Sequence, residues 1–571
     1  MTRVPGPFVL LDDARPGGET ILYTGLREVV ETRDPAEVKD CLERLRGRKA
    51  AGFLAYEAGH VLEPKLAPLA RTPGPDEPPL LWFGTFAEAR RGALEIDAAG
   101  AWAGAARPLI SRAEYEAALA AVKAHILAGD IYQANLTFAA DVPVAGHPIA
   151  LYAALRERAG AGHGAIVFTG EHWLLSLSPE LFFTLEKGKV TARPMKGTAP
   201  PDADPEAFRA DPKQRAENLM IVDLLRNDLS RVARTGSVKV PALFEVEHYP
   251  TLLQLTSTVT AELEDGRDAI DLLHAIYPCG SITGAPKIRA MEIIHALEAS
   301  PRGPYCGAIG RLAPGGSAAF NVAIRTLTLR DGAAVAQLGL GSGIVADSEA
   351  DAEWDECLVK GKFVQTQRRF DLIETMRFDP LEGVIDLDRH LARMRASAAA
   401  LDFPFDRHEA RNELQAATFR AGPSRVRLLL SRSGCFAIEL RPLTPPPEEP
   451  VEVVLAPLPV DAEDFRLRHK TSDRAFYDEA RAAAGTFETI FCDPQGFLTE
   501  GSFTNIFVER GGRLVTPPLA RGLLPGILRG RLLEEGRAVE GDLRAADLAN
   551  GFFLGNAVRG LVPARLRQKA A

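Results

Sequence analysis

The pattern of strand and helix signals in this chain runs to about residue 365 and then starts afresh. A strand pattern at residues 370–377 and an amphipathic helix pattern around residues 387–400 open the second run. The 571 residues also exceed what one hydrophobic core supports. The sequence therefore predicts two modules, residues 1–368 and 369–571, whose seam at 365–370 has no obvious flexible linker.

Helix and strand signals become sharp from residue 111 onward, whereas residues 1–100 read as irregular. Ser111 and Glu114 form a capping box before apolar residues at helical spacing, and Gly129 ends that helix. Residues 131–138 alternate as a strand, with Tyr132 on the apolar face. Further elements are expected in this order: helices at 216–233 and after Pro286, a hairpin of 318–330 with 333–340, and a helix at 349–363.

The second module carries two further structural signals. Residues 487–516 read as strands with turns at 493–496 and 511–512. The proline-rich run 444–450 fits either an inter-lobe connection or a surface loop, and the sequence leaves both open.

Composition excludes several classes of partner and site. The net charge is −9 and no basic block is present, so nucleic acid is not an expected partner. No apolar run of about 18 residues and no signal peptide is seen, so no membrane partner is expected. The six cysteines are scattered without zinc-site or disulfide spacing, which is typical of a cytoplasmic protein with reduced thiols.

Three charged residues near the end of the first module share one predicted helical face. Glu353, Glu356 and Lys360 lie within about 60° of each other around the helix axis. Two carboxylates one turn apart suit a hard cation such as Mg²⁺, although a solvated charged face gives the same pattern. The glycine-rich segments 280–286 and 339–348 could bring backbone N–H groups close to an anion.

Seven motifs in order give the first module a specific resemblance. They are GDIYQANLT (129–137), SPELF (178–182), RPMKGT (193–198), RAENLMIVDLLRNDLSRV (215–232), GSITGAPKIRAMEII (280–294), VAIRTL (322–327) and GSGIVADSEADAEWDECLVK (341–360). Residues 110–365 thus resemble the chorismate-utilising family, which includes anthranilate, aminodeoxychorismate, isochorismate and salicylate synthases. The resemblance implies an α/β (α+β) fold with antiparallel sheets flanked by helices.

Two positions within these motifs distinguish the chemistries of that family. Isochorismate-type relatives carry a water-activating lysine where this chain has Gln133, so Gln133 resembles the amine-using branch. Anthranilate synthases carry alanine where this chain has Lys196, which resembles the nucleophile of aminodeoxychorismate synthases. By the same resemblance Glu180 is the general acid, and both roles require shifted pKa values.

The remaining site residues of the first module are also implied by the resemblance. Glu217, Glu353 and Glu356 match the Mg²⁺ ligands of the family. The matching substrate contacts are Thr283, Arg325, Lys360 and the backbone of Gly341 and Gly343. Three positions depart from the family pattern, namely Gln214, Gln254 and Arg311.

Residues 370–571 carry a second set of motifs. They are FDLIETMR (370–377), DRHLARMRASAAALDFPF (388–405), HKTSDRAFYDEAR (469–481), LTEGSFTNIFV (498–508), VTPPLARGLLPGILR (515–529) and LGNAVRGLVPA (554–564). They resemble the fold-type IV pyridoxal-phosphate family, which implies a two-lobed module. That family holds branched-chain and D-amino-acid aminotransferases and aminodeoxychorismate lyase.

The resemblance assigns cofactor roles in the second module. Lys470 is the lysine that bonds covalently to pyridoxal phosphate, and Glu500 is the partner of its pyridinium nitrogen. Arg393 matches the phosphate arginine. Residues Gly526, Ile527 and Leu528 follow Pro525 at an expected helix start, where a phosphate could bind.

Together the two resemblances imply a Mg²⁺-dependent conversion of chorismate and ammonia to 4-amino-4-deoxychorismate, followed by pyridoxal-phosphate-dependent loss of pyruvate to give 4-aminobenzoate. No glutaminase triad is evident, so a separate glutamine amidotransferase subunit is the expected ammonia source. A homodimer through the second module is possible on family grounds. Two alternatives stay open: an aminotransferase as second module, or an anthranilate synthase component I as first module.

Overall fold

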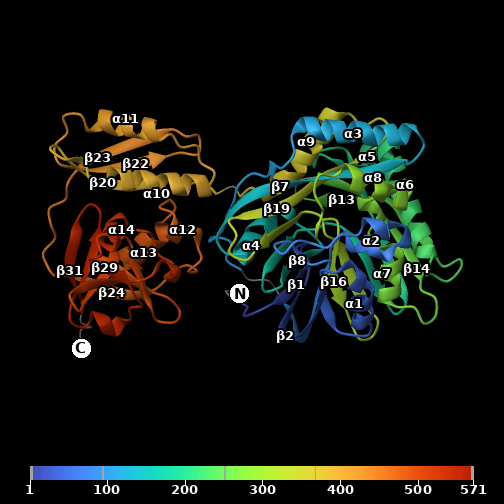
Figure 1. Cartoon of the computed structure of the whole chain (residues 1–571), viewed down its shortest axis with the longest axis horizontal. Coiled ribbons are helices and arrows are strands. Elements are labelled where there is room, and N and C mark those ends of the chain that lie inside the picture. Colours follow the sequence, from blue (N-terminus) through green and yellow to red (C-terminus); the bar gives the residue numbers. More distant parts are fainter. Residues whose placement is uncertain (1–3, 93–95, 250–251, 367, 568–571) are drawn as a thin grey trace. The chain divides into compact units, whose positions relative to one another are not determined.

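The computed structural model describes residues 4–92, 96–249, 252–366 and 368–567. The chain forms two compact units (Figure 1). The first unit comprises Met1–Ala98, Ala105–Pro143 and Tyr152–Thr366, and the second comprises Ala99–Gly104, Val144–Leu151 and Gln367–Ala571. The second unit thus includes two short early segments that the sequence pattern did not indicate.

Antiparallel pairs connect the first nineteen strands. Their bounds are β1 Phe8–Asp12, β2 Thr20–Thr32, β3 Ala50–Leu54, β4 Leu81–Gly92, β5 Trp102–Ala103, β6 Arg107–Pro108, β7 Gln133–Ala145, β8 Gly164–Phe168, β9 His172–Ser176, β10 Leu181–Glu186, β11 Lys189–Arg193, β12 Met195–Ala199, β13 Lys239–Tyr249, β14 Leu252–Glu262, β15 Gly284–Ala285, β16 Ala308–Leu312, β17 Ala318–Val322, β18 Thr326–Arg330 and β19 Val335–Ile344. The accompanying helices are α1 Val38–Leu45, α2 Ala58–Leu62, α3 Arg112–Leu127, α4 Pro148–Ala159, α5 Pro205–Ala210, α6 Pro212–Ser230, α7 Ala269–Ile276, α8 Lys287–Leu297 and α9 Ala350–Gly361. The expected antiparallel sheets with helices are therefore confirmed.

The first hundred residues are not irregular, so that expectation was wrong. Strands β1 to β4 lie there, and β3 pairs with both β4 and β16. All five residues of β3 are buried, which leaves no alternation of polar and apolar positions for sequence reading to detect.

Most helix predictions from residue 111 onward are confirmed, with ends shifted by a few residues. Ser111 accepts the Glu114 N–H at the start of α3, and the Glu114 carboxylate accepts the Ser111 N–H in return. Tyr132 was assigned wrongly to a buried face. It is 71% exposed and precedes β7, and its N–H is donated to the carbonyl oxygen of Ala285 on β15.

The first strand of the predicted 318–340 hairpin is interrupted, so that it forms two separate strands. Strand β17 ends at Val322, and β18 begins only at Thr326. Arg325, between them, has a positive φ of 49°, a conformation that continues no strand. The turn around residues 331–332 is confirmed by the antiparallel pair of β18 and β19.

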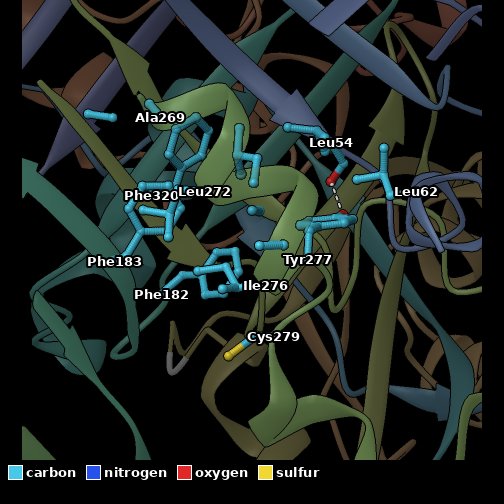
Figure 2. Packing of buried hydrophobic residues seen from close by; sticks show 14 of the residues in the cluster. Leu54, Leu62, Phe182, Phe183, Ala269, Leu272, Ile276, Tyr277, Cys279 and Phe320 are labelled. Atoms are coloured by element: carbon cyan, nitrogen blue, oxygen red, sulfur yellow. Dashed lines mark hydrogen bonds between the residues drawn. The ribbon is translucent and has the colours of Figure 1, made fainter. Parts of the chain in front are cut away.

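The largest apolar cluster lies around α7 in the first unit (Figure 2). Phe182, Phe183 and Phe320 gather beside this helix, with 5.3 Å between the ring centroids of Phe183 and Phe320. The Tyr277 hydroxyl donates to the Leu54 carbonyl oxygen at 3.1 Å. This core fixes β10, which follows Glu180, against β17.

Over residues 368–567, the second unit contains a four-stranded and an eight-stranded sheet. The four-stranded lobe consists of β20 Leu372–Asp379, β21 Gly383–Val384, β22 Ser424–Leu430 and β23 Phe436–Pro442, with α10 Leu387–Ala400 and α11 Arg407–Thr418. The other consists of β24 Val451–Pro457, β25 Glu488–Cys492, β26 Leu498–Gly501, β27 Asn505–Arg510, β28 Arg513–Thr516, β29 Ala538–Glu540, β30 Phe552–Asn556 and β31 Gly560–Leu566, with α12 Phe465–Arg468, α13 Ala475–Ala484 and α14 Ile527–Glu534. The two-lobed prediction is confirmed. The proline-rich run 444–450 joins β23 of one lobe to β24 of the other, which is the inter-lobe alternative.

In the part of the chain that the structure describes, every helix is too short or too polar to cross a membrane.

Truncation of Phe320 to alanine is expected to destabilise the first unit by about 3–5 kcal/mol, because it leaves a cavity beside two aromatic rings. Leu127→Ala, at an 81% exposed position, is expected to change stability by less than about 0.5 kcal/mol. Urea unfolding followed by tryptophan fluorescence measures both. Equal effects of the two substitutions would contradict the assignment of Phe320 to the core.

Candidate active sites

Lys196 and Glu180 come from neighbouring parts of the first unit. Lys196 lies on β12, and Glu180 directly precedes β10. Burial raises the pKa of Glu180, and interactions with the Ser281 side chain, Lys196 and the Met195 N–H oppose that rise. The Oε1 atom of Glu180 has no hydrogen-bond partner among the described residues, although Glu180 is only 3% exposed. A buried carboxyl oxygen is therefore left available beside the lysine.

Burial shifts both groups toward their neutral forms. It raises the pKa of Glu180 to about 7. It also lowers the pKa of Lys196, and the positive charge of Lys360 acts in the same direction. Both shifts favour the neutral forms, a protonated carboxyl group and an unprotonated amine, which are the forms that acid and nucleophilic catalysis require.

Gly343 and Gln133 lie beside the amine of Lys196. Strands β7 and β19 pair so that Gly343 is opposite Asn135. A Cβ atom at Gly343 would lie 2.9 Å from Lys196 Nζ and 3.9 Å from Gln133 Oε1. A side chain at this position would require the lysine amine to shift. The structure thus brings together three residues that the sequence predicted for one site.

The other predicted substrate contacts lie on the same strands and the neighbouring loop. Thr283 is fully buried, and its backbone oxygen accepts the Asn135 N–H at 2.7 Å. Its hydroxyl donates to Cys279 and Gly280 carbonyls of its own loop, at 3.2 and 3.1 Å. Arg325 lies between β17 and β18, and its carbonyl oxygen accepts the Leu177 N–H.

Lys360 connects the strand of Gly341 to the acidic helix α9. Its amine donates to the Gly341 carbonyl oxygen at 3.0 Å and pairs with Glu356 at 2.6 Å. The attraction of Lys360 lowers the Glu356 pKa, against the effect of burial. Lys360 therefore lies at the border between the predicted substrate contacts and the predicted metal ligands.

The three predicted metal ligands are near each other but do not form a closed cluster. Burial raises the pKa of Glu217, and the negative charges of Glu356 and Glu353 contribute to the same shift. Glu353 accepts a hydrogen bond from Ser348 at 2.7 Å. Within the described ranges, no three His, Cys, Asp or Glu side chains are arranged to hold a metal ion. Three carboxylates suit Mg²⁺ chemically, and their joint ligation stays a prediction.

Two of the three departures from the family pattern contact the residue that follows Lys196. Gln254 Nε2 donates to the Gly197 carbonyl oxygen at 2.7 Å. Gly197 has a positive φ of 86°, and a Cβ there would collide with the Gln214 side-chain oxygen. Sequence reading noted both glutamines but found no role for them. Their contacts indicate that they position the Lys196 segment.

In the second unit, Lys470 follows α12 and Glu500 lies on β26. Burial lowers the pKa of Lys470 to about 7, and Arg474 and Arg393 add to this effect. Burial raises the pKa of Glu500 to about 7. Glu500 accepts hydrogen bonds from the Tyr477 hydroxyl at 2.7 Å and the Leu524 N–H at 3.1 Å. Sequence reading missed Tyr477, which is a buried partner of the predicted cofactor acid.

Arg393 lies beside the start of helix α14. Its Nη1 donates to the Pro525 carbonyl oxygen at 3.0 Å, next to Gly526, the N-cap of α14. Its other donors contact Glu374 at 2.8 and 2.6 Å. Residues Gly526, Ile527 and Leu528 thus present a helix N-terminus next to a guanidinium group. This pairing fits the phosphate of pyridoxal phosphate.

Two family profiles match successive parts of the chain. A family profile described as "chorismate binding enzyme" matches residues 12–366, and one described as "Amino-transferase class IV" matches residues 371–566. Aminodeoxychorismate synthase component 1 of Klebsiella aerogenes is 45% identical over 261 residues, which are 44% of this chain and 57% of that protein. Anthranilate synthase component 1 of Streptomyces coelicolor is 40% identical over 268 residues, which are 46% of this chain and 52% of that protein.

The structure of anthranilate synthase component I from Streptococcus pneumoniae aligns with a TM-score of 0.50 and 26% identity. The alignment covers 64% of this chain and 94% of that one. The chain spans about half the length of the curated relatives that it matches.

The raised pKa of Glu180 predicts a pH-dependent effect of its substitution on stability. The folded-state pKa of about 7 exceeds the ordinary 4.5. The stability that the protein has with Glu180 protonated is therefore fully present below pH 4.5 and is lost as pH rises through about 7. Glu180→Gln is therefore expected to unfold at higher urea than the unsubstituted protein at pH 8, but at similar urea at pH 5. Exposed Glu186→Gln, on β10, is the control. A difference that does not change with pH would contradict the raised pKa.

Proposed function

Because this chain belongs to the chorismate binding enzyme family, we propose that its first unit replaces the C4 hydroxyl of chorismate with an amino group. The observation that carries this proposal is the amine of Lys196, with its lowered pKa, beside the protonatable Glu180. Relatives at similar identity include both aminodeoxychorismate and anthranilate synthases. The lysine supports the former, since it offers a nucleophile.

The proposed reaction divides one difficult substitution into two steps. Lys196 Nζ attacks C2 of chorismate, both ring double bonds shift, to C1=C6 and C4=C5, and the C4 hydroxyl leaves as water with a proton from Glu180. Ammonia then attacks C4, both double bonds return to their original positions, and the C2–N bond breaks to release Lys196 as an amine. The net change is chorismate plus ammonia to 4-amino-4-deoxychorismate plus water.

Other residues of the first unit orient the substrate in this scheme. Arg325 and Lys360 would hold carboxylates, assisted by Thr283 and the backbone of Gly341 and Gly343. Glu217, Glu353 and Glu356 would hold Mg²⁺, which supplies positive charge for a substrate carboxylate. Gln133 would offer an amide to the incoming amine instead of a base for water. A glutamine amidotransferase subunit would supply the ammonia.

The second unit is proposed to convert that product to 4-aminobenzoate and pyruvate. Bound pyridoxal phosphate would supply an electron sink, held by Arg393, Glu500 and the start of α14. Lys470, with a pKa of about 7, can take the C4 proton of the substrate at Nζ. Loss of the enolpyruvyl group makes the ring aromatic, so no amino acceptor is needed. The neighbouring synthase unit favours this lyase reaction over transamination.

Lys196→Ala is expected to lower formation of 4-amino-4-deoxychorismate by roughly 100-fold or more, because the nucleophile is lost. Mass analysis of products from chorismate, ammonium, Mg²⁺ and pyridoxal phosphate measures this loss. Lys189→Ala, at an exposed position on the adjacent strand β11, is the control and should keep full activity. Unchanged rate and product in Lys196→Ala would rule out the covalent step, and anthranilate from the unsubstituted protein would rule out the synthase assignment.

Lys470→Ala is expected to stop the pathway after the first unit, since the proton-transferring amine is lost while the first site is intact. The same mass assay should then show 4-amino-4-deoxychorismate accumulating in place of 4-aminobenzoate. Lys470→Ala protein that still forms 4-aminobenzoate and pyruvate at the original rate would be incompatible with the lyase role. Keto-acid formation from added amino acids would instead identify an aminotransferase.

A further inference from the structure

A segment from the first fifth of the sequence is built into the core of the second unit. Strand β5, Trp102–Ala103, lies in the segment Ala99–Gly104 and pairs with Ala145 and Val144. Trp102 is 2% exposed and belongs to the same apolar cluster as Phe370 and Phe465. The cofactor-binding unit is therefore completed by a tryptophan that lies more than 250 residues before its own motifs.

Two backbone hydrogen bonds in series connect this segment to the residue before Lys470. Phe465 begins α12, and its N–H is donated to the Gly100 carbonyl oxygen at 3.3 Å. The Phe465 carbonyl oxygen in turn accepts the His469 N–H at 3.0 Å, one residue before Lys470. The segment thus fixes the start of the short helix from which Lys470 extends.

Phe370 gives the aromatic cluster a second connection to the Lys470 backbone, through β20. Its centroid lies 5.5 Å from that of Phe465. Phe370 leads into β20, where the Ile373 N–H is donated to the Lys470 carbonyl oxygen at 2.9 Å. Movement of the aromatic cluster would therefore change two restraints on the Lys470 backbone.

A guanidinium group holds the aromatic rings in place. Arg432 lies 4.0 Å from the ring centroid of Phe403 and 5.4 Å from those of Trp102 and Phe370. It also donates to the Leu401 carbonyl oxygen at 2.7 Å. The Trp102 ring is thus one wall of a cation–π site, in which an aromatic replacement preserves more than an aliphatic one.

A series of polar contacts connects residues 99–104 to Asp473, three residues after Lys470. The Ala99 carbonyl oxygen accepts a hydrogen bond from Arg368, and Arg368 also pairs with Asp473. Asp473 contacts Arg466 at 3.4 Å, and Arg466 pairs with Asp464 at 2.5 Å. The segment is therefore connected to residues on both sides of Lys470.

We propose that residues 99–104 are a positioning element of the pyridoxal-phosphate site, acting through the backbone that carries Lys470. The inference rests on the proposed role of Lys470 in the second unit. Trp102 does not touch the cofactor in this proposal. It keeps the backbone around Lys470 in the geometry that retains the cofactor. A part of the sequence outside residues 369–571 therefore contributes to cofactor affinity.

The test uses Trp102→Ala and Trp102→Phe in the full chain. Trp102→Ala is expected to weaken pyridoxal-phosphate binding by about tenfold or more, and to shift the pH midpoint of the cofactor absorbance between 330 and 430 nm. Trp102→Phe should restore most of both values, because it keeps a ring beside Arg432. Phe419→Ala, a 73% exposed aromatic position of the same unit, is the matched control. Amination of chorismate by the first unit should be unchanged in all variants.

Arg368→Met supplies a second variant in case Trp102→Ala fails to fold. It removes the series of polar contacts without opening the apolar core, and it is also expected to weaken cofactor binding and shift the pH midpoint. Wild-type affinity and pH midpoint in Arg368→Met, together with wild-type values in any folded Trp102→Ala protein, would overturn the inference alone. An unsubstituted chain that binds no pyridoxal phosphate would overturn the proposed function of the second unit and, with it, this inference.

Discussion

Burial of a lysine amine near a carboxyl group is the interaction on which both units depend. Water stabilises charged groups strongly, so removal of water favours a neutral amine and a neutral carboxyl group. Lys196 with Glu180, and Lys470 with Glu500, are shifted in these directions. The surrounding sheets and helices supply the enclosure, and the chemistry proposed for each unit follows from it.

Such enclosure requires a second set of residues that hold the reacting groups in place. Gln254 contacts the residue after Lys196, and Tyr477 donates to Glu500. Arg393 donates two hydrogen bonds to the Glu374 carboxylate. Burial would raise the pKa of Glu374, but the charge of Arg393, with a smaller contribution from His390, lowers it to about 2. These contacts limit the motion of groups that must stay ready for proton transfer.

Sequence reading found the elements with strong periodicity and missed those without it. The capping box of α3 and the turns between β25 and β28 were predictable because local residues determine them. Strand β3 was not, since burial of every residue removes its alternation. Motif resemblance named Lys196, Glu180, Lys470 and Glu500 as site residues, but it gave no role to Gln254 or Tyr477, whose contacts join segments distant in sequence.

The sequence by itself determined the two families, the order of their motifs and the residue types available for catalysis. Only the tertiary structure decided which groups lose water, and therefore which pKa values shift, because burial is a property of the assembled core. It also decided that Trp102 belongs to the second unit. No local pattern encodes that placement, since it arises from packing between segments more than 250 residues apart.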